Sequence, residues 1–204
     1  ETVMTTLHAG GKFGGKAYTV SSGLHGVGVS AVNALSSRLR VEIHRDDKVY
    51  SQEFSAGKRI SELTSSKMDP SLNGRTGTTV SYTPDAGIFP EIVYDFHMLS
   101  QRFKEMAYLN KGLEVHFRSD WHVNLWPNNE ATYYFDGGIS SFVRDLNHNR
   151  IPLHKDPIYA ERQVDGTKVE AALQYNDSFN ELVYSFANCV NTADGGSHLT
   201  GFRA

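Results

Sequence analysis

The sequence predicts an α+β fold, because segments with alternating apolar residues are interspersed with segments that carry apolar residues at helical spacing. Residues 39–43 place Leu, Val and Ile at every second position, which is typical of a half-buried strand. Residues 96–106 place Phe, Leu, Phe and Met on one helical face, with Asp95 as a candidate N-cap. A glycine-rich stretch, residues 23–28, directly precedes an apolar, helix-compatible run at 29–35.

The composition excludes several classes of protein. A chain of 204 residues can bury a core as one domain or two. Its net charge of -3 and pI near 6.3 argue against an overall electrostatic grip on nucleic acid, although other parts of a larger machine could bind DNA. Cys189 is the only cysteine, so no internal disulfide can form, and a reducing cytoplasm fits. No apolar run is long enough to span a membrane.

Both ends of the sequence lead us to expect an internal fragment of a longer protein. The chain begins at Glu1 without an initiator Met or a signal peptide, and enters a structured segment at once. It stops at residues 201–204, which look like the opening of another element. Some residues of an active site could therefore lie outside it.

The glycine-rich stretch admits two interpretations. Glycine adopts positive φ readily and lets a ligand approach the backbone, and a helix that begins there offers free N–H groups to a phosphate. The alternative is a tight turn before a packed helix, in which the glycines serve geometry alone. The spacing G-x-x-G-x-G differs from the G-x-G-x-x-G of dinucleotide-binding proteins. The spacing by itself leaves both interpretations open.

A second glycine-rich segment lies upstream, within residues 1–22. Residues 10–17 nearly match the P-loop pattern, but Ala17 replaces the hydroxyl that binds magnesium, and no buried strand precedes them. We therefore reject a P-loop. A long glycine-rich loop in a compact domain is typical of a lid or binding loop, and Phe13 and Tyr18 give it docking groups; a plain linker is the alternative.

The remaining elements follow from the same two periodicities and from turn residues. The expected order is a helix to about residue 37, a strand over 38–44, a turn at Asp46–Asp47, an antiparallel partner over 48–54, variable surface over 55–76, a strand over 78–83, a helix over 95–109, strands over 113–117 and 131–135, and a short helix over 139–146.

A domain boundary is expected near residue 150, where Ile151–Pro152 and Pro157 interrupt the pattern. Beyond it, residues 169–175 alternate, Asn176–Asp177 signals a turn, and residues 182–189 form a second strand. We interpret this as a hairpin that opens a new β-rich domain.

Few side chains outside the glycine loops suggest chemistry. The nine His residues match no zinc pattern, and no nucleophile elbow is present. His25 could face a phosphate or hydrogen-bond the backbone. Met106 is expected in the core, and Trp121 and Trp126 in surface or edge packing. Asp46–Asp47 belongs to a turn and is a poor catalytic candidate.

The motifs also carry a family resemblance. Residues 7–13, followed by 23–36, resemble the ATP lid and second glycine box of the gyrase B subunits of bacterial type IIA topoisomerases, for which this pair of motifs is highly specific. Residues 76–78, with the strand and Pro84–Asp85, resemble the third box of that family. Residues 191–203 are similar to a signature in its transducer domain. The likeness covers nearly the whole chain and is weakest at about 55–75 and 119–130.

The resemblance implies a GHKL (Bergerat) ATPase fold over residues 1–150, a two-layer sandwich of a mixed β-sheet with helices on one face. Residues 151–204 would begin a β-rich transducer domain like ribosomal S5 domain 2. It further implies a cytoplasmic enzyme that uses ATP and Mg²⁺ to introduce negative supercoils into double-stranded DNA. Its partners would be the gyrase A subunit, in a heterotetramer of two A and two B subunits, and a second B subunit upon ATP binding.

The resemblance also assigns site residues by position. Lys12 and Tyr18 would contact the nucleotide from the lid, and Thr78 would support the adenine end. Backbone N–H groups would wrap the phosphates from Gly23, Leu24, His25, Gly26, Val27, Gly28 and Val29. The general base (a Glu), the metal-holding Asn and the adenine-reading Asp of the family would lie upstream of Glu1. No catalytic or metal residue is therefore assigned, and the fragment alone is expected to be inactive.

Two departures from the family pattern affect the lid rather than the chemistry. Ser22 stands where a third glycine is often found, and Gly14–Gly15 replaces a more polar pair. The alternative functions are the B-type subunit of topoisomerase IV, which decatenates DNA, and another GHKL ATPase such as a sensor kinase or chaperone. The segment 195–198 disfavours the latter. A non-enzymatic binding module with a purely structural glycine loop is the remaining alternative.

Overall fold

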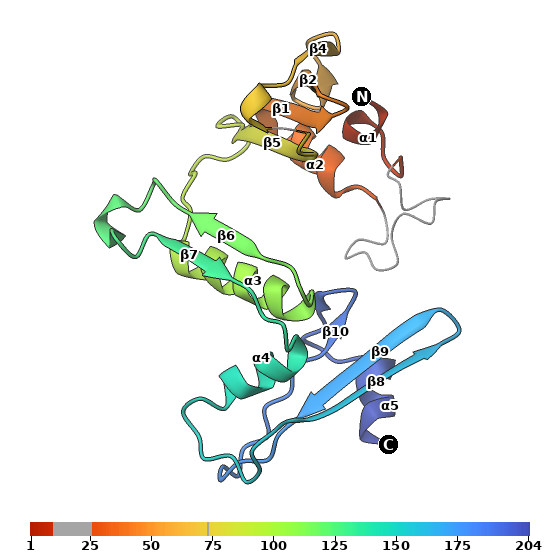
Figure 1. Cartoon of the computed structure of the whole chain (residues 1–204), viewed down its shortest axis with the longest axis vertical. Coiled ribbons are helices and arrows are strands. Elements are labelled where there is room, and N and C mark those ends of the chain that lie inside the picture. Colours follow the sequence, from red (N-terminus) through yellow and green to blue (C-terminus); the bar gives the residue numbers. More distant parts are fainter. Residues whose placement is uncertain (10–25, 73) are drawn as a thin grey trace. The chain divides into compact units, whose positions relative to one another are not determined.

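The computed structural model describes residues 1–9, 26–72 and 74–204. They form two compact units, Glu1–Val93 and Tyr94–Ala204 (Figure 1). Within these residues every strand pairing is antiparallel. The division into units reflects packing and does not test the predicted domain boundary near residue 150, which stays a prediction.

The first unit contains a five-stranded sheet. Its strands are β1 (Ser36–Arg45), β2 (Lys48–Ser55), β3 (Lys58–Arg59), β4 (Thr64–Lys67) and β5 (Gly77–Pro84). They are arranged in the order β3-β2-β1-β5, and β4 also pairs with β2. Asp46 and Asp47 join β1 to β2 with φ of 52° and 55°, the conformation of a two-residue hairpin turn. The hairpin predicted from the alternation at 39–43 is therefore confirmed.

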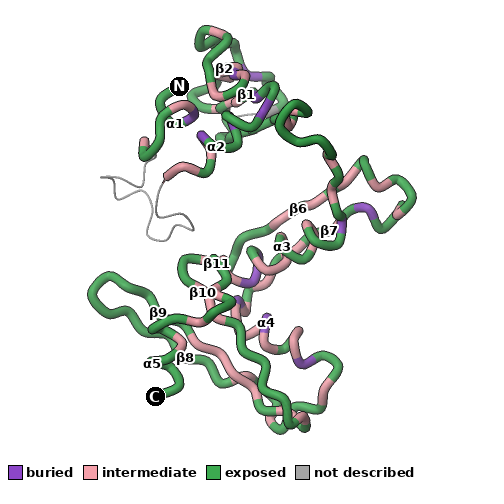
Figure 2. Tube along the Cα trace, turned by 180° about the vertical axis from the view of Figure 1, so that it is seen from behind, coloured by how far each residue is buried: buried purple, intermediate pink, exposed green. Residues whose placement is uncertain are grey.

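The core of this unit lies between the sheet and two short helices, α1 (Thr2–Thr5) and α2 (Gly28–Ala34). Met4, Leu39 and Phe54 are buried together, and Val29 and Val41 pack against them. The buried stretches of α1, α2, β1 and β2 are purple in Figure 2. The helix that follows the glycine stretch thus packs on the sheet through Val29, and Ser30 and Asn33 are its buried residues.

Two expectations for this unit need correction. The helix predicted to reach about residue 37 ends at Ala34, because Ser36 already begins β1 and its hydroxyl donates to the Val32 carbonyl at 2.6 Å. Residues 55–76, expected only as variable surface, contain β3, β4 and the 3-10 turn η1 (Pro70–Leu72). These strands were not predicted because Lys, Ser and Thr give them no apolar alternation.

The second unit begins with α3 (Phe96–Leu109), which packs against the hairpin of β6 (Val115–Arg118) and β7 (Glu130–Tyr133). The predicted cap is confirmed, because the Asp95 carboxylate accepts from the Met98 N–H at 2.8 Å. Met106 was predicted in the core, but 37% of it is exposed. The helical stripe turns toward solvent there, while Ala107 and Tyr108 are buried instead.

Aromatic side chains hold this unit together. Phe117 of β6 stacks on Phe96 with ring centroids 4.9 Å apart, and Tyr108 stacks on Phe135 and Phe142 at 3.7 and 5.0 Å. Phe142 lies on α4 (Ile139–Leu146), a helix that the sequence predicted correctly. The unit also includes the 3-10 turn η2 (Val123–Leu125).

The predicted hairpin of residues 169–175 with 182–189 is wrong. The partner of β9 (Thr167–Leu173) is β8 (Ile158–Val164), joined to it by Asp165–Gly166 at positive φ. Asp-Gly between two strand-forming segments is a strong hairpin signal, which favours the nearer partner. Residues 182–189 contribute only β10 (Phe186–Ala187), which pairs with β11 (Val190–Asn191). The chain ends with α5 (Ser197–Arg203).

Trp121 and Trp126 are exposed, as predicted. Cys189 carries a free thiol. Across the described ranges, no helix is both long and apolar enough to cross a membrane.

Candidate functional site

The residues predicted to bind a ligand divide into two groups. Five of them lie outside the described residues: Lys12, Tyr18, Gly23, Leu24 and His25. The other five are described, namely Gly26, Val27, Gly28 and Val29 at the start of α2, and Thr78 on β5. All of the described candidates belong to the first unit.

The described end of the glycine stretch has the conformation that its sequence requires. Gly26 has φ of 60°, in the left-handed region that favours glycine, and Val27 caps the helix. A Cβ placed on Gly28 would meet no atom of the described residues within 4 Å, so none of those residues fills the space on that side of Gly28. Val29 turns the other way and packs on the core.

The first turn of α2 presents backbone donors. The Ala31 N–H donates to the Val27 carbonyl at 2.9 Å and thus begins the helical hydrogen-bond pattern. The preceding N–H groups, from Gly28 to Ser30, have no acceptor within the helix. The Ser30 side chain is occupied, because its hydroxyl donates to the Val27 carbonyl at 3.0 Å. Backbone groups, rather than side chains, are what this turn offers to a ligand.

Thr78 lies on the face of the sheet that α2 covers. Its register partner is Ile43, and the partner of Tyr82 is Leu39, which belongs to the core beneath Val29. Direct cross-strand partners share one face, so all of these side chains are on the same side of the sheet. Thr78 is four residues from Tyr82, which corresponds to about 13 Å along the strand. Its side chain is exposed.

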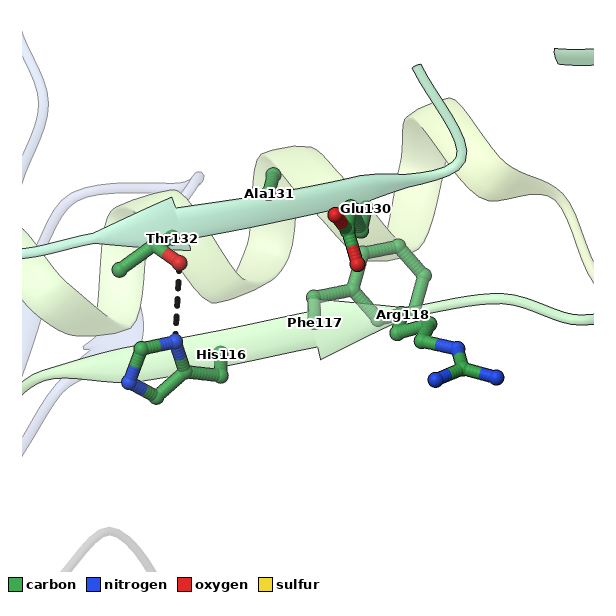
Figure 3. Close-up of a pocket in the computed structure, with 6 residues that line it drawn as sticks. All are labelled: His116, Phe117, Arg118, Glu130, Ala131 and Thr132. Atoms are coloured by element: carbon green, nitrogen blue, oxygen red, sulfur yellow. Dashed lines mark hydrogen bonds between the residues drawn. The ribbon is translucent and has the colours of Figure 1, made fainter. Parts of the chain in front are cut away.

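A second polar site, which we did not predict from the sequence, lies on the β6–β7 hairpin (Figure 3). It is an open hollow of about 570 Å³, lined by His116, Phe117, Arg118, Glu130, Ala131 and Thr132. The His116 ring hydrogen-bonds to Thr132 through Nδ1 at 2.8 Å. Its Nε2 lies 2.6 Å from a carboxylate oxygen of Glu114. The alternation of polar residues along both strands is the signal that could have located this hollow.

The charges on this hairpin largely compensate each other. Arg118 pairs with Asp120 at 2.9 Å, and this hydrogen bond, with the nearby charges of Asp120 and Glu130, raises the pKa of the guanidinium. The cation is therefore engaged with carboxylates of its own chain. The second polar site consequently has less to offer an anionic ligand than the backbone N–H groups from Gly28 to Ser30.

No metal centre is evident in the described ranges, since no three His, Cys, Asp or Glu side chains gather there in a group that could hold an ion.

Comparison with known proteins identifies the family. The sequence model of the DNA gyrase B family matches residues 138–204. Over the whole chain, the DNA gyrase B subunits of Halalkalibacterium halodurans and Archaeoglobus fulgidus are 46% and 47% identical. The chain belongs to the DNA gyrase B family. It spans 31% of the length of these relatives.

Solved structures agree with the predicted fold class. The 43K ATPase domain of Thermus thermophilus gyrase B, in complex with an aminocoumarin, aligns with a TM-score of 0.77 and 33% identity, over 87% of this chain and 46% of that one. The B subunit of Myxococcus xanthus DNA gyrase also gives 0.77, at 30% identity, over 88% of this chain and 50% of that one. The topoisomerase IV ATP-binding domain of Francisella tularensis aligns with a TM-score of 0.69 and 28% identity, over 87% of this chain and 46% of that one. The α+β GHKL ATPase fold predicted for this gyrase B family member is confirmed.

Proposed function

We propose that this chain forms part of the ATP-hydrolysing subunit of a DNA gyrase, which introduces negative supercoils into double-stranded DNA. The observation that carries the proposal is the match to gyrase B subunits along the entire chain, at 46% identity for one of them. The likeness to the topoisomerase IV domain is weaker than that to the gyrase domains, at TM-scores of 0.69 and 0.77, which favours supercoiling over decatenation.

In this proposal the nucleotide lies along the sheet face covered by α2. Backbone N–H groups of the stretch from Gly23 to Val29 hold the phosphates, because fixed donors stabilise negative charge without reorganising. Lys12 and Tyr18 contact the nucleotide from the lid, and Thr78 supports the adenine. Two observations support this arrangement: no described atom lies within 4 Å of a Cβ placed on Gly28, and Thr78 shares a face with the core residues beneath Val29.

The proposal extends to the partners and the location of the protein. Mg²⁺ would accompany ATP; the described residues contain no group of three His, Cys, Asp or Glu side chains that could hold an ion, so we assign it no step. Residues 151–204 would begin the transducer domain. We further propose a cytoplasmic heterotetramer of two A and two B subunits, in which the B subunits dimerise upon ATP binding.

The experiment is an assay of the full-length protein with its A-type partner, on relaxed circular DNA and on linked circles, with and without ATP. The expected result is ATP-dependent negative supercoiling that exceeds decatenation. Preferential unlinking would instead assign the chain to a topoisomerase IV. Saturable nucleotide binding without any DNA passage would support another GHKL ATPase, and the absence of nucleotide binding would leave only a structural role for the glycine loop.

A further inference from the structure

Asn33 is a polar residue in the core of the first unit. Its side chain lies on α2 and is completely buried. The Nδ2 atom donates a hydrogen bond of 2.9 Å to the backbone carbonyl of Met4, which belongs to α1. The two residues are 29 positions apart in the chain, and the glycine stretch lies between them. Asn33 therefore fastens the helix after the glycine stretch to the helix before it.

The other end of the same amide is unusual. The Oδ1 atom is buried and has no hydrogen-bond partner among the described residues. The orientation of the amide follows from Met4, whose carbonyl can only accept and so requires Nδ2. A buried oxygen without a donor destabilises a fold, whereas an apolar side chain of similar size would avoid that cost. The contribution of Asn33 to stability therefore does not account for its presence.

Asn33 also connects α2 to the sheet. Its backbone carbonyl accepts from the Gly57 N–H at 3.1 Å, in the turn that follows β2. Together with the Met4 bond, this fixes α2 on two sides, while Val29 rests on the core below. Gly28 and Val29 lie just over one turn before Asn33 on the same helix. The direction in which their N–H groups point is therefore set by these three contacts.

We infer that Asn33 is a positioning residue for nucleotide binding: by fastening α2 to Met4, it aims the backbone N–H groups at Gly28 and Val29 toward the phosphates. This inference rests on the proposed function, whose phosphate site it deepens. Asn33 is too deeply buried to touch the ligand, so it acts through the orientation of α2. A loss of this bond lets the first turn of α2 rotate, and the donors lose their alignment.

The experiment uses the full-length protein with Asn33→Ala, and with Asn33→Ser, whose hydroxyl is too short to reach Met4. The matched control is Ser36→Ala. Ser36 is equally buried, but its hydroxyl donates to Val32 within its own segment at 2.6 Å and does not reach α1. Three quantities are measured: the dissociation constant of a non-hydrolysable ATP analogue, the KM and kcat for ATP, and amide hydrogen exchange in β1 as a report of stability.

Both Asn33 variants should raise the KM for ATP and the dissociation constant of the analogue about tenfold, with kcat changed less than about twofold, because misaligned backbone N–H groups form weaker hydrogen bonds to the charged phosphates. Ser36→Ala should speed amide hydrogen exchange in β1 about as much as the Asn33 variants do, but it should leave the KM and the dissociation constant unchanged. If Asn33→Ala does not fold, the shift must still be present in Asn33→Ser.

Binding constants of the Asn33 variants that move no further than those of Ser36→Ala would overturn the positioning role, while the proposed function would stand. An unmodified protein that does not bind the analogue at all would overturn the proposed function, and the inference with it. The two failures are therefore distinguishable.

Discussion

Leu39 on β1 and Phe54 on β2 are direct register partners, and both side chains are completely buried. With Met4 they form the contact through which α1, α2 and the sheet become one unit. The pair lies at the end of the hairpin away from the Asp46–Asp47 turn. The two side chains support α2, the helix that carries the proposed phosphate site, through their contact with Val29. Removing either side chain should therefore weaken the packing of α2 as well as that of the sheet.

Phe54→Ala should lower the free energy of unfolding by about 3–5 kcal/mol, because it removes a large side chain and leaves a cavity in a small core. Amide hydrogen exchange in β1 and β2, measured over a range of denaturant concentrations, checks this. Val80→Ala on β5 is the control, since Val80 is 47% exposed and should cost less than about 1 kcal/mol. Equal costs for the two variants would contradict the assignment of the core.

Gly26→Val should abolish most nucleotide binding, because a β-branched residue is strained at φ of 60° and its side chain adds bulk where the phosphates are proposed to approach. Gly74→Ala is the control for strain alone, since Gly74 has φ of 70°, faces open space and lies outside the glycine stretch. We expect both variants to lose stability, by about 1–2 kcal/mol. Only Gly26→Val should weaken binding in a titration with a non-hydrolysable ATP analogue, and wild-type affinity in that variant would count against the phosphate site.

Lys12→Ala should lower ATP turnover by about a hundredfold, because it removes a cation from the negative charge that develops on the phosphates. Steady-state kinetics of the full-length protein measure the effect. Lys16→Ala, in the same segment, is the matched control and should stay close to the unmodified rate. Indistinguishable kinetics for the two variants would remove Lys12 from the proposed site.

Gly196 and Gly201 provide a matched pair in the second unit. Gly196 has φ of 153° and ψ of 176°, a region almost exclusive to glycine, and a Cβ there would lie 2.8 Å from the His198 ring. Gly196→Ala should therefore destabilise the start of α5 by about 1–3 kcal/mol. Gly201→Ala, inside α5 with no neighbour within 4 Å, should stabilise that helix by about 0.5–1 kcal/mol. The rate of amide hydrogen exchange in α5 should rise in Gly196→Ala and fall in Gly201→Ala. A change in the same direction in both variants would refute the contrast between the two glycines.

The elements predicted correctly from the sequence are those whose apolar residues have one clear period. The α3 helix was predicted with its cap because Asp95 precedes a regular stripe, and β1 because Leu39 and Val41 alternate with charged residues. The β3 and β4 strands were not predicted, because all of their residues are exposed and polar. Hydrogen bonds to β2 hold these strands in place, and such bonds leave no apolar pattern in the sequence. The β8–β9 hairpin was missed although Asp165–Gly166 marks it.

For the candidate site, motifs located the glycine turn, and the geometry at Gly26 and Gly28 agrees with it. The spacing of glycines could not reveal Asn33, because its importance lies in a bond to Met4 that only the folded chain forms. A single Asn in an apolar helix gives no periodic signal. Whether the sequence-assigned site residues bind ATP stays a prediction.

The alkaline stability of the second unit should depend on Tyr108. Burial raises the pKa of the Tyr108 hydroxyl well above its ordinary value. The negative charge of Asp145, and a hydrogen bond to its carboxylate, raise this pKa further. In the unfolded chain Tyr ionises near pH 10. Below that pH both states are protonated, so the stabilising effect of Tyr108 is fully present; as the pH rises further, only the unfolded state ionises and stability falls. Tyr108→Phe should remove this part of the decline.

Tyr159 is the matched control for that variant. Its pKa is also raised, by desolvation and by hydrogen bonds to Glu161 and Glu170, but its side chain is 44% exposed on the β8–β9 hairpin, where solvent screens the carboxylates. The free energy of unfolding of the second unit, measured with denaturant between about pH 9 and 11, should therefore fall less steeply with pH in Tyr108→Phe than in the unmodified protein. The same slope should change much less in Tyr159→Phe. Parallel pH profiles for Tyr108→Phe and the unmodified protein would show that ionisation of Tyr108 is not coupled to unfolding.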